Sequence, residues 1–282
     1  MTLTVAWQPS SISIYLNDFE YSISNAYPGL NKLSQDFTTH LSDDDVEVFL
    51  RIFSMLYADD TIVMAESAKE LQNALNAVHD YCRTWFLTVN TSKTKIVVSS
   101  RGKTRRHPIF TYGTDSIETV HDYVYLGCQF NYNNKFNKTK SRQVSQGRRA
   151  MFSLLTKSKK LELPLDIQSE LFDQLVSPIL LYGSEIWGYE DCKILESFHV
   201  KFCKNVLKVN KNTANCIALG ELGRVKIRYG INCRMLCFWL RLKSGNSSKL
   251  SCTMLRLLKS MSDAQTYSSP WISKKLRSYS MN

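Results

Sequence analysis

The chain has 282 residues, of which 44% are hydrophobic and 11% aromatic, and this composition excludes an intrinsically disordered protein. Its length allows one large domain or two ordinary domains with cores of their own. The formal net charge of +11 predicts a polyanionic partner, although a basic composition is a weak indication on its own.

The charge is unevenly distributed along the chain. Residues 1–100 carry 6 Lys and Arg against 12 Asp and Glu, residues 101–160 carry 13 against 3, and residues 161–282 carry 17 against 10. An acidic segment followed by a basic one suits an enzyme that holds metal ions in one place and phosphates in another. A solvated charged face is the alternative, and it is the better interpretation for the short run 101–106.

The eight cysteines include no Cys-x-x-Cys pair, and the N-terminus lacks the basic and apolar regions of a secretion signal. Reduced thiols in an intracellular protein, nuclear or cytoplasmic, are therefore expected. A zinc site at Cys233, Cys237, His199 and Cys203 is the alternative, but thiols buried in a core are the better interpretation. No apolar run approaches bilayer length, so a soluble protein without a membrane partner is predicted.

A helix and a β-hairpin are predicted in the N-terminal part. Residues 8–21 predict the helix. The segments 46–57 and 61–65 are rich in β-branched and aromatic residues, and the turn between them contains Asp59 and Asp60. Two neighbouring carboxylates at the tip of an apolar hairpin repel each other, and a divalent cation such as Mg²⁺ relieves the repulsion. A plain turn, in which aspartate is common, is the alternative.

A second helix follows the hairpin. Ser67 and Glu70 form a capping-box pattern that opens a helix through about residue 86. Its apolar positions recur at spacings of three and four and predict a face packed on a sheet. They are Leu71, Leu75, Val78, Cys82 and Trp85. Lys93 and Lys95 then lead into a strand.

Further strands are predicted before residue 131. Residues 109–120 predict a compact hairpin with its turn at Gly113. Residues 123–130 predict one more strand, in which a glycine allows the close approach of another backbone.

The remaining chain is predicted to be helical. The segment 131–160 is dense in Lys, Arg, Asn and Gln, and we expect it to track phosphates. The side chains expected to do so are Lys138, Arg142, Arg148 and Arg149. Pro164 ends this helix, and Pro178 and Gly183 divide a later one. The aromatic residues beyond, which are Tyr182, Trp187, Phe238 and Trp239, are predicted to pack in the core.

Three motifs carry a resemblance to a known family. They are Tyr-Ala-Asp-Asp at 57–60, Lys-Thr-Lys at 93–95 and Tyr-Leu-Gly at 125–127. Their order, and the sequence LYADDTIVMAES, resemble the reverse transcriptases of non-LTR (LINE-type) retrotransposons. The resemblance covers about residues 8–243.

The resemblance implies an α+β fold. Residues 1–130 would form a partial palm with an antiparallel sheet and packed helices. Residues 131–243 would form an all-α thumb and connection region, and residues 244–282 a loosely ordered basic tail.

The family copies an RNA template onto a DNA primer from deoxynucleoside triphosphates, using two divalent ions, Mg²⁺ or Mn²⁺. The resemblance therefore implies that Asp59 and Asp60 are catalytic metal ligands. It implies that Lys93 protonates or stabilises the departing pyrophosphate. It also implies a primer grip formed by Tyr125, Leu126 and Gly127.

The chain departs from the family upstream of the metal motif. The family's first palm carboxylate has no counterpart, and the aspartates at 43–45 lie in polar sequence that predicts a solvated loop. Two acids on one hairpin do not surround two cations, so a fragment that is inactive by itself is expected. The alternatives are a nucleic-acid-binding remnant without chemistry and a fragment destabilised by an open sheet edge.

Overall fold

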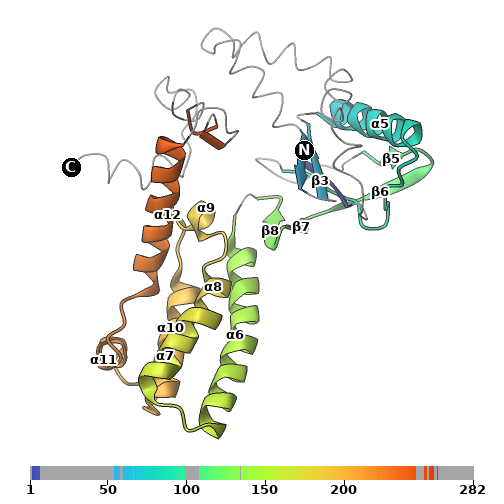
Figure 1. The fold of residues 1–282 in the computed structure, drawn as a ribbon. Helices are drawn as coiled ribbons and strands as arrows, with labels where there is room; N and C mark the ends of the chain where they lie inside the picture. Colours follow the sequence, from blue (N-terminus) through green and yellow to red (C-terminus); the bar gives the residue numbers. More distant parts are fainter. Residues whose placement is uncertain are drawn as a thin grey trace. The chain divides into compact units, whose positions relative to one another are not determined.

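The computed structural model in Figure 1 divides the chain into two compact units, Met1–Lys135 and Phe136–Asn282. The residues that it describes are 2–6, 54–57, 60–65, 67–99, 108–133, 135–245, 251, 252, 254–256 and 259. The predicted helix at 8–21, the loop at 43–45 and most of the predicted tail lie outside these residues. The first unit holds the strands and the second is helical, so the α+β class is confirmed.

The first unit is built on a six-stranded sheet with the strand order β2-β3-β1-β4-β6-β5. The strands are β1 (Thr2–Ala6), β2 (Ser54–Tyr57), β3 (Asp60–Met64), β4 (Lys95–Val97), β5 (Phe110–Tyr112) and β6 (Asp115–Val120). Neighbouring strands are antiparallel except β4 and β6, which pair in parallel. This one parallel pair was not part of the predicted antiparallel sheet.

The helix α5 (Ala68–Thr84) packs on this sheet (Figure 1). Its predicted capping box is confirmed: Glu70 N donates to Ser67 Oγ at 3.2 Å, and Ser67 N donates to Glu70 Oε2 at 3.3 Å. Residues of the helix and of the sheet share one apolar core, which includes Val63, Leu71, Leu75, Val78, Ile96, Phe110 and Ile117. The prediction for Trp85 is wrong, because this residue follows the helix and is 41% exposed.

The edge strand β5 is tied to α5 by one side chain. Gln72 Nε2 donates to Thr111 O at 2.8 Å, and Thr111 N donates to Gln72 Oε1 at 3.0 Å. The amide thereby satisfies backbone groups that an edge strand leaves open. Gly113, with a φ of +58°, turns the chain from β5 into β6, and a Cβ there would lie 2.9 Å from His79 Nε2. The predicted hairpin is confirmed.

A separate two-stranded sheet consists of β7 (Asp122–Tyr125) and β8 (Cys128–Asn131). The prediction of a single strand over this region is therefore wrong. Leu126 and Gly127 connect the two strands with φ angles of +45° and +78°. Positive φ at both central residues is the signature of the type I′ turn, whose twist matches that of paired strands.

The described part of the second unit is all helical. Its helices are α6 (Asn137–Lys160), α7 (Leu165–Leu175), α8 (Ser177–Leu180), α9 (Ser184–Trp187), α10 (Lys193–Val206), α11 (Asn215–Glu221) and α12 (Ile227–Ser244). The predicted breaks are confirmed, since Pro164 precedes α7, Pro178 lies in the first turn of α8, and Gly183 precedes α9 with a φ of +69°. In the described part of the chain, no helix is both long and apolar enough to cross a membrane.

The core of this unit is apolar and includes Phe172, Trp187, Phe202 and Ile231. The predicted burial of Trp187 is confirmed, whereas Tyr182 is exposed and its predicted place in the core is wrong. The same core encloses Cys203, and burial raises the pKa of this thiol to about 11. Cys233 and Cys237 are exposed, so the prediction of buried thiols is wrong for them.

A buried ion pair lies at the start of α6. Lys140 Nζ is 2.7 Å from Glu190 Oε2 and also donates to Asp191 O at 2.9 Å. Phe136 N donates to the other oxygen of Glu190 at 3.3 Å. Arg228 of α12 donates to the carbonyl oxygens of Gly188 and Glu190, both at 2.8 Å. The loop before α10 is thus held by two cations.

A second polar cluster surrounds Arg224, in the loop before α12. The guanidinium pairs with Asp173 and lies 5.1 Å from the centroid of the Phe172 ring. Its Nε donates to His199 Nε2 at 2.8 Å. Burial, together with the positive charge of Arg224, lowers the pKa of His199 to about 4. The imidazole is therefore neutral and accepts a hydrogen bond.

Candidate functional site

The hairpin predicted around the two aspartates is confirmed where the structure describes it. β2 and β3 pair in antiparallel register as far as Tyr57 and Asp60. Asp60 also pairs with Ala6 of β1, so its backbone begins an inner strand of the sheet. Asp59 lies outside the described residues.

Lys93 is positioned by a turn that Asn90 organises. Lys93 N donates to Asn90 O at 3.2 Å and to Asn90 Oδ1 at 3.1 Å. Thr94 Oγ1 donates to Asn90 O at 2.9 Å, and Thr94 is buried. Asparagine suits this role because its side chain mimics a backbone turn. The turn leaves Lys93 exposed immediately before β4.

Asp60 and Lys93 lie at the same end of the sheet. Thr4 of β1 pairs with Ile62 on one side and with Lys95 on the other. Asp60 precedes Ile62 by two residues, and Lys93 precedes Lys95 by two. β1 is antiparallel to both neighbours, so β3 and β4 run in the same direction and begin at the same end of the sheet. Two strand spacings, on the order of 10 Å, separate them.

The two lysines of the Lys-Thr-Lys motif differ in their surroundings. Lys95 Nζ lies 2.7 Å from Glu118 Oε2, across the parallel pair β4 and β6. Within the described residues, the ammonium of Lys93 pairs with no carboxylate. An ammonium without such a partner can donate hydrogen bonds to an incoming anion. That Lys93 rather than Lys95 contacts a phosphate stays a prediction.

The acidic side chains fit a hard divalent cation by their chemistry, since Mg²⁺ binds carboxylate oxygens. Asp59 and Asp60 supply two such groups at neighbouring positions. In the described ranges, no three His, Cys, Asp or Glu side chains cluster closely enough to hold a metal ion. Whether Asp59 and Asp60 bind a metal ion stays a prediction, since Asp59 lies outside the described residues.

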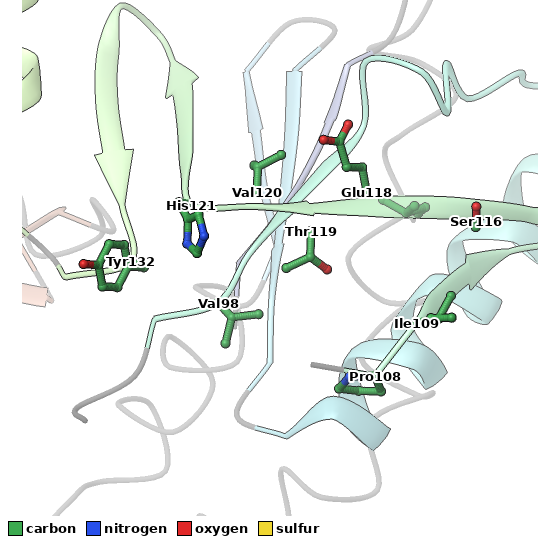
Figure 2. Close-up of a pocket in the computed structure, with 10 residues that line it drawn as sticks. Val98, Pro108, Ile109, Ser116, Glu118, Thr119, Val120, His121 and Tyr132 are labelled. Atoms are coloured by element: carbon green, nitrogen blue, oxygen red, sulfur yellow. The ribbon is translucent and has the colours of Figure 1, made fainter. Parts of the chain in front are cut away.

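A cavity of about 600 Å³ adjoins β6, in the same unit. Figure 2 shows His121 and Tyr132 together at one end of it, with Pro108 and Ile109 at the other. The two rings meet edge to face with centroids 5.5 Å apart. The cavity includes Glu118, the partner of Lys95, but neither Asp60 nor Lys93 lines it. The cavity is therefore not the place where Asp60 and Lys93 would meet a substrate.

The predicted primer-grip residues form the tip of a hairpin. Tyr125 ends β7 and is half-buried, whereas Leu126 is 37% exposed and Gly127 follows it in the turn. The tip belongs to the two-stranded sheet and not to the sheet of Asp60 and Lys93.

The predicted phosphate-contacting residues lie on α6, in the second unit. Lys138, Arg142, Arg148 and Arg149 are all exposed, and the helix contains no acidic residue. Exposed Phe152 continues the helical row of Lys138, Arg142 and Arg149. Phe152 was not among the predicted phosphate-contacting residues, although its spacing of three from Arg149 places it in this row.

Two comparisons with known proteins agree with these motifs. Residues 9–130 match the family model for reverse transcriptase (RNA-dependent DNA polymerase). A stretch of 143 residues is 28% identical to a transposon-derived protein of Caenorhabditis elegans. That alignment covers 48% of this chain and 49% of the relative, so the chain spans about half the length of the curated relative that it matches. The matched family region contains the hairpin, Lys93 and the Tyr-Leu-Gly turn.

Proposed function

We propose that the chain is part of a non-LTR retrotransposon reverse transcriptase, whose aspartate hairpin holds Mg²⁺ or Mn²⁺ for template-directed nucleotidyl transfer. The observation that supports this most directly is the common sheet edge of Asp60 and Lys93, inside the segment that matches the reverse transcriptase family. An aspartate and a lysine at one end of a sheet suit a substrate that carries phosphates and a metal.

Each residue group has a role in this proposal. Asp59 and Asp60 would hold the cations, and the chemistry that bound cations would supply is neutralisation of charge on the triphosphate and activation of the primer hydroxyl. Lys93 donates a proton or a hydrogen bond to the pyrophosphate as it leaves. The Leu126–Gly127 turn supports the primer backbone, and the exposed cations of α6 bind phosphates of the RNA template and DNA primer.

The proposal includes inactivity of the chain by itself. Mg²⁺ requires near-octahedral oxygen coordination, and two neighbouring carboxylates supply too few ligands for two such ions. We therefore expect nucleic-acid binding and weak metal binding, without primer extension.

Primer extension tests the proposal with a DNA primer annealed to an RNA template, deoxynucleoside triphosphates and Mg²⁺ or Mn²⁺. We expect no extended product. Extension that is lost in Asp59→Ala would contradict the inactivity and support the catalytic assignment.

Manganese binding, followed by electron paramagnetic resonance, tests the metal site independently of activity. Asp59→Asn with Asp60→Asn should abolish Mn²⁺ binding, whereas Asp80→Asn, at an exposed position of α5, should leave it unchanged. Equal binding by the two variants and the original chain would refute the metal site.

A nucleic-acid-binding remnant without chemistry is the second candidate. The exposed cations of acid-free α6 favour it. It predicts binding of RNA or DNA that weakens steeply with salt and is unaffected by Asp59→Ala, together with no Mn²⁺ binding.

A further inference from the structure

The last long helix of the second unit, α12, is basic and contains no acidic residue. It lies within a stretch, 222–262, that has nine Lys and Arg and no Asp or Glu. The nine are Arg224, Lys226, Arg228, Arg234, Arg241, Lys243, Lys249, Arg256 and Lys259. The helices α7 and α10 of this unit differ, since both carry acids, whereas α6 shares the absence of acids with α12. The absence of any counter-charge makes α12 complementary to a polyanion.

The arginines of α12 fall into two groups. Arg228 makes its hydrogen bonds within the protein, since it donates to two carbonyl oxygens and to Cys192 Sγ. Arg234 is exposed, and its Nη1 lies 3.5 Å from Leu181 O, which is long for a hydrogen bond. Arg241 is also exposed and lies 5.8 Å from the centroid of the Phe238 ring. These two guanidinium groups remain available to solvent on the outer side of the helix.

Apolar side chains share the exposed side of α12. Tyr229 is 60% exposed and Leu240 is exposed as well, whereas Ile227, Ile231 and Met235 form the buried side. An ordinary surface helix places polar residues opposite its core-facing stripe. Apolar residues on both sides therefore indicate that the outer side meets another molecule.

Six of the exposed residues of α12 form two adjacent rows. Tyr229, Cys233 and Leu240 follow one line at helical spacing, and Arg234, Cys237 and Arg241 follow the next. A flat aromatic ring beside a line of guanidinium groups provides a stacking surface for a base and contacts for its phosphates. We name these six residues the outer face of α12.

We propose that the outer face of α12 is a second nucleic-acid-binding surface, distinct from α6, which binds single-stranded RNA or DNA through phosphate contacts of Arg234 and Arg241 and stacking on Tyr229. The proposal shares the nucleic-acid partner of the proposed function and is independent of the aspartate hairpin.

The two thiols of this face report directly on its occupation. Cys233 and Cys237 are exposed within it, and Cys216 is exposed on α11, outside it. The full chain is alkylated with N-ethylmaleimide, with and without a single-stranded RNA oligonucleotide, and mass spectrometry gives the modification rate of each thiol. We expect the RNA to slow modification of Cys233 and Cys237 and to leave Cys216 unchanged. Equal rates with and without RNA would overturn the proposal.

Salt dependence of binding provides the second measurement. Arg234→Gln with Arg241→Gln should reduce the slope of log K against log salt by about 1.4, because each phosphate of a single strand that a cation neutralises contributes about 0.7. Lys201→Gln with Lys211→Gln removes two exposed cations outside the face and should leave the slope unchanged. An unchanged slope for the arginine variant, with circular dichroism like that of the original chain, would overturn the proposal.

Two further arms separate this surface from its neighbours and from other partners. If Arg142→Gln with Arg149→Gln abolishes binding, and Arg234→Gln with Arg241→Gln leaves binding intact, the nucleic acid binds to α6 alone. That result overturns the inference and leaves the proposed function intact. If phosphatidylserine vesicles slow the alkylation of Cys233 and Cys237 and RNA does not, the outer face of α12 binds membranes instead. That result would also overturn the inference.

Discussion

Lys140 and Glu190 form an ion pair of 2.7 Å in which the lysine side chain is only 2% exposed. The pair joins the first turns of α6 to the loop before α10. Glu190 accepts from Phe136 N and Lys140 donates to Asp191 O, so polar atoms beyond the pair are also satisfied. A complete pair of this kind changes the free energy of unfolding little, whereas removal of one partner lowers that free energy strongly.

Replacing Lys140 should therefore destabilise the second unit strongly. Lys140→Met leaves the half-buried carboxylate of Glu190 without its cation, and we expect a loss of about 3–5 kcal/mol in the free energy of unfolding. Lys159→Met, at an exposed position of the same helix, should change it by at most about 0.5 kcal/mol. Urea denaturation measures both. Equal effects would show that the pair contributes no more than a surface ion pair does.

Acidification should destabilise the second unit through His199. Its pKa of about 4 in the folded protein lies below the ordinary value of 6.5. Between these two values the unfolded chain binds a proton that the folded chain does not, so the free energy of unfolding falls as the pH falls. The loss is about 1.4 kcal/mol per pKa unit, or about 3 kcal/mol across the whole window.

His199→Gln provides the test of this titration. The glutamine amide keeps an acceptor for Arg224 but does not titrate. We expect the original chain to lose stability between pH 6.5 and 4 in urea denaturation, and the variant to lose less by about 3 kcal/mol. Parallel pH profiles of the two proteins would contradict the assignment.

Replacing Leu126 in the turn should raise stability and weaken nucleic-acid binding. A leucine at a φ of +45° is strained, whereas asparagine followed by glycine is the preferred sequence of a type I′ turn. Leu126→Asn should therefore raise the stability of the first unit by about 1 kcal/mol. If the turn supports a primer, the same change weakens binding of a primer–template duplex. Higher stability with unchanged binding would remove the turn from the nucleic-acid site.

The capping box of α5 should contribute a measurable part of the stability of the first unit. Ser67→Ala removes the acceptor for Glu70 N and should cost about 1 kcal/mol. Ser116→Ala, at an exposed position of β6, serves as the control and should have little effect. Thermal unfolding followed by circular dichroism measures both, and equal midpoints would show that solvent replaces the cap fully.

Features that depend on neighbouring residues were predictable from the sequence. The capping box at Ser67, the turn at Gly113 and the break at Gly183 all arise from backbone geometry that a few adjacent residues determine. The turn at Leu126 was missed because leucine rarely adopts positive φ, and strand-forming residues on both sides conceal it.

Features that depend on distant partners were not predictable. Lys140 belongs to a basic, polar segment, and its burial depends on Glu190, fifty residues later. Likewise, only the register of β4 and β6 shows that Lys95 meets Glu118, which leaves Lys93 as the available lysine of the candidate site. The exposure of Cys237 and Tyr182 has the same origin, since helical period alone does not say which side of a helix is covered.

The two apolar cores, one around Val63 and Leu75 and the other around Phe172 and Trp187, share no residue among those described. Cooperative melting requires a common core, so scanning calorimetry should resolve two heat-absorption peaks. Substitutions at Ser67 and at Lys140 would then shift different peaks, and their effects in a combined variant would add. Each half of the chain could accordingly accumulate changes without a penalty in the other.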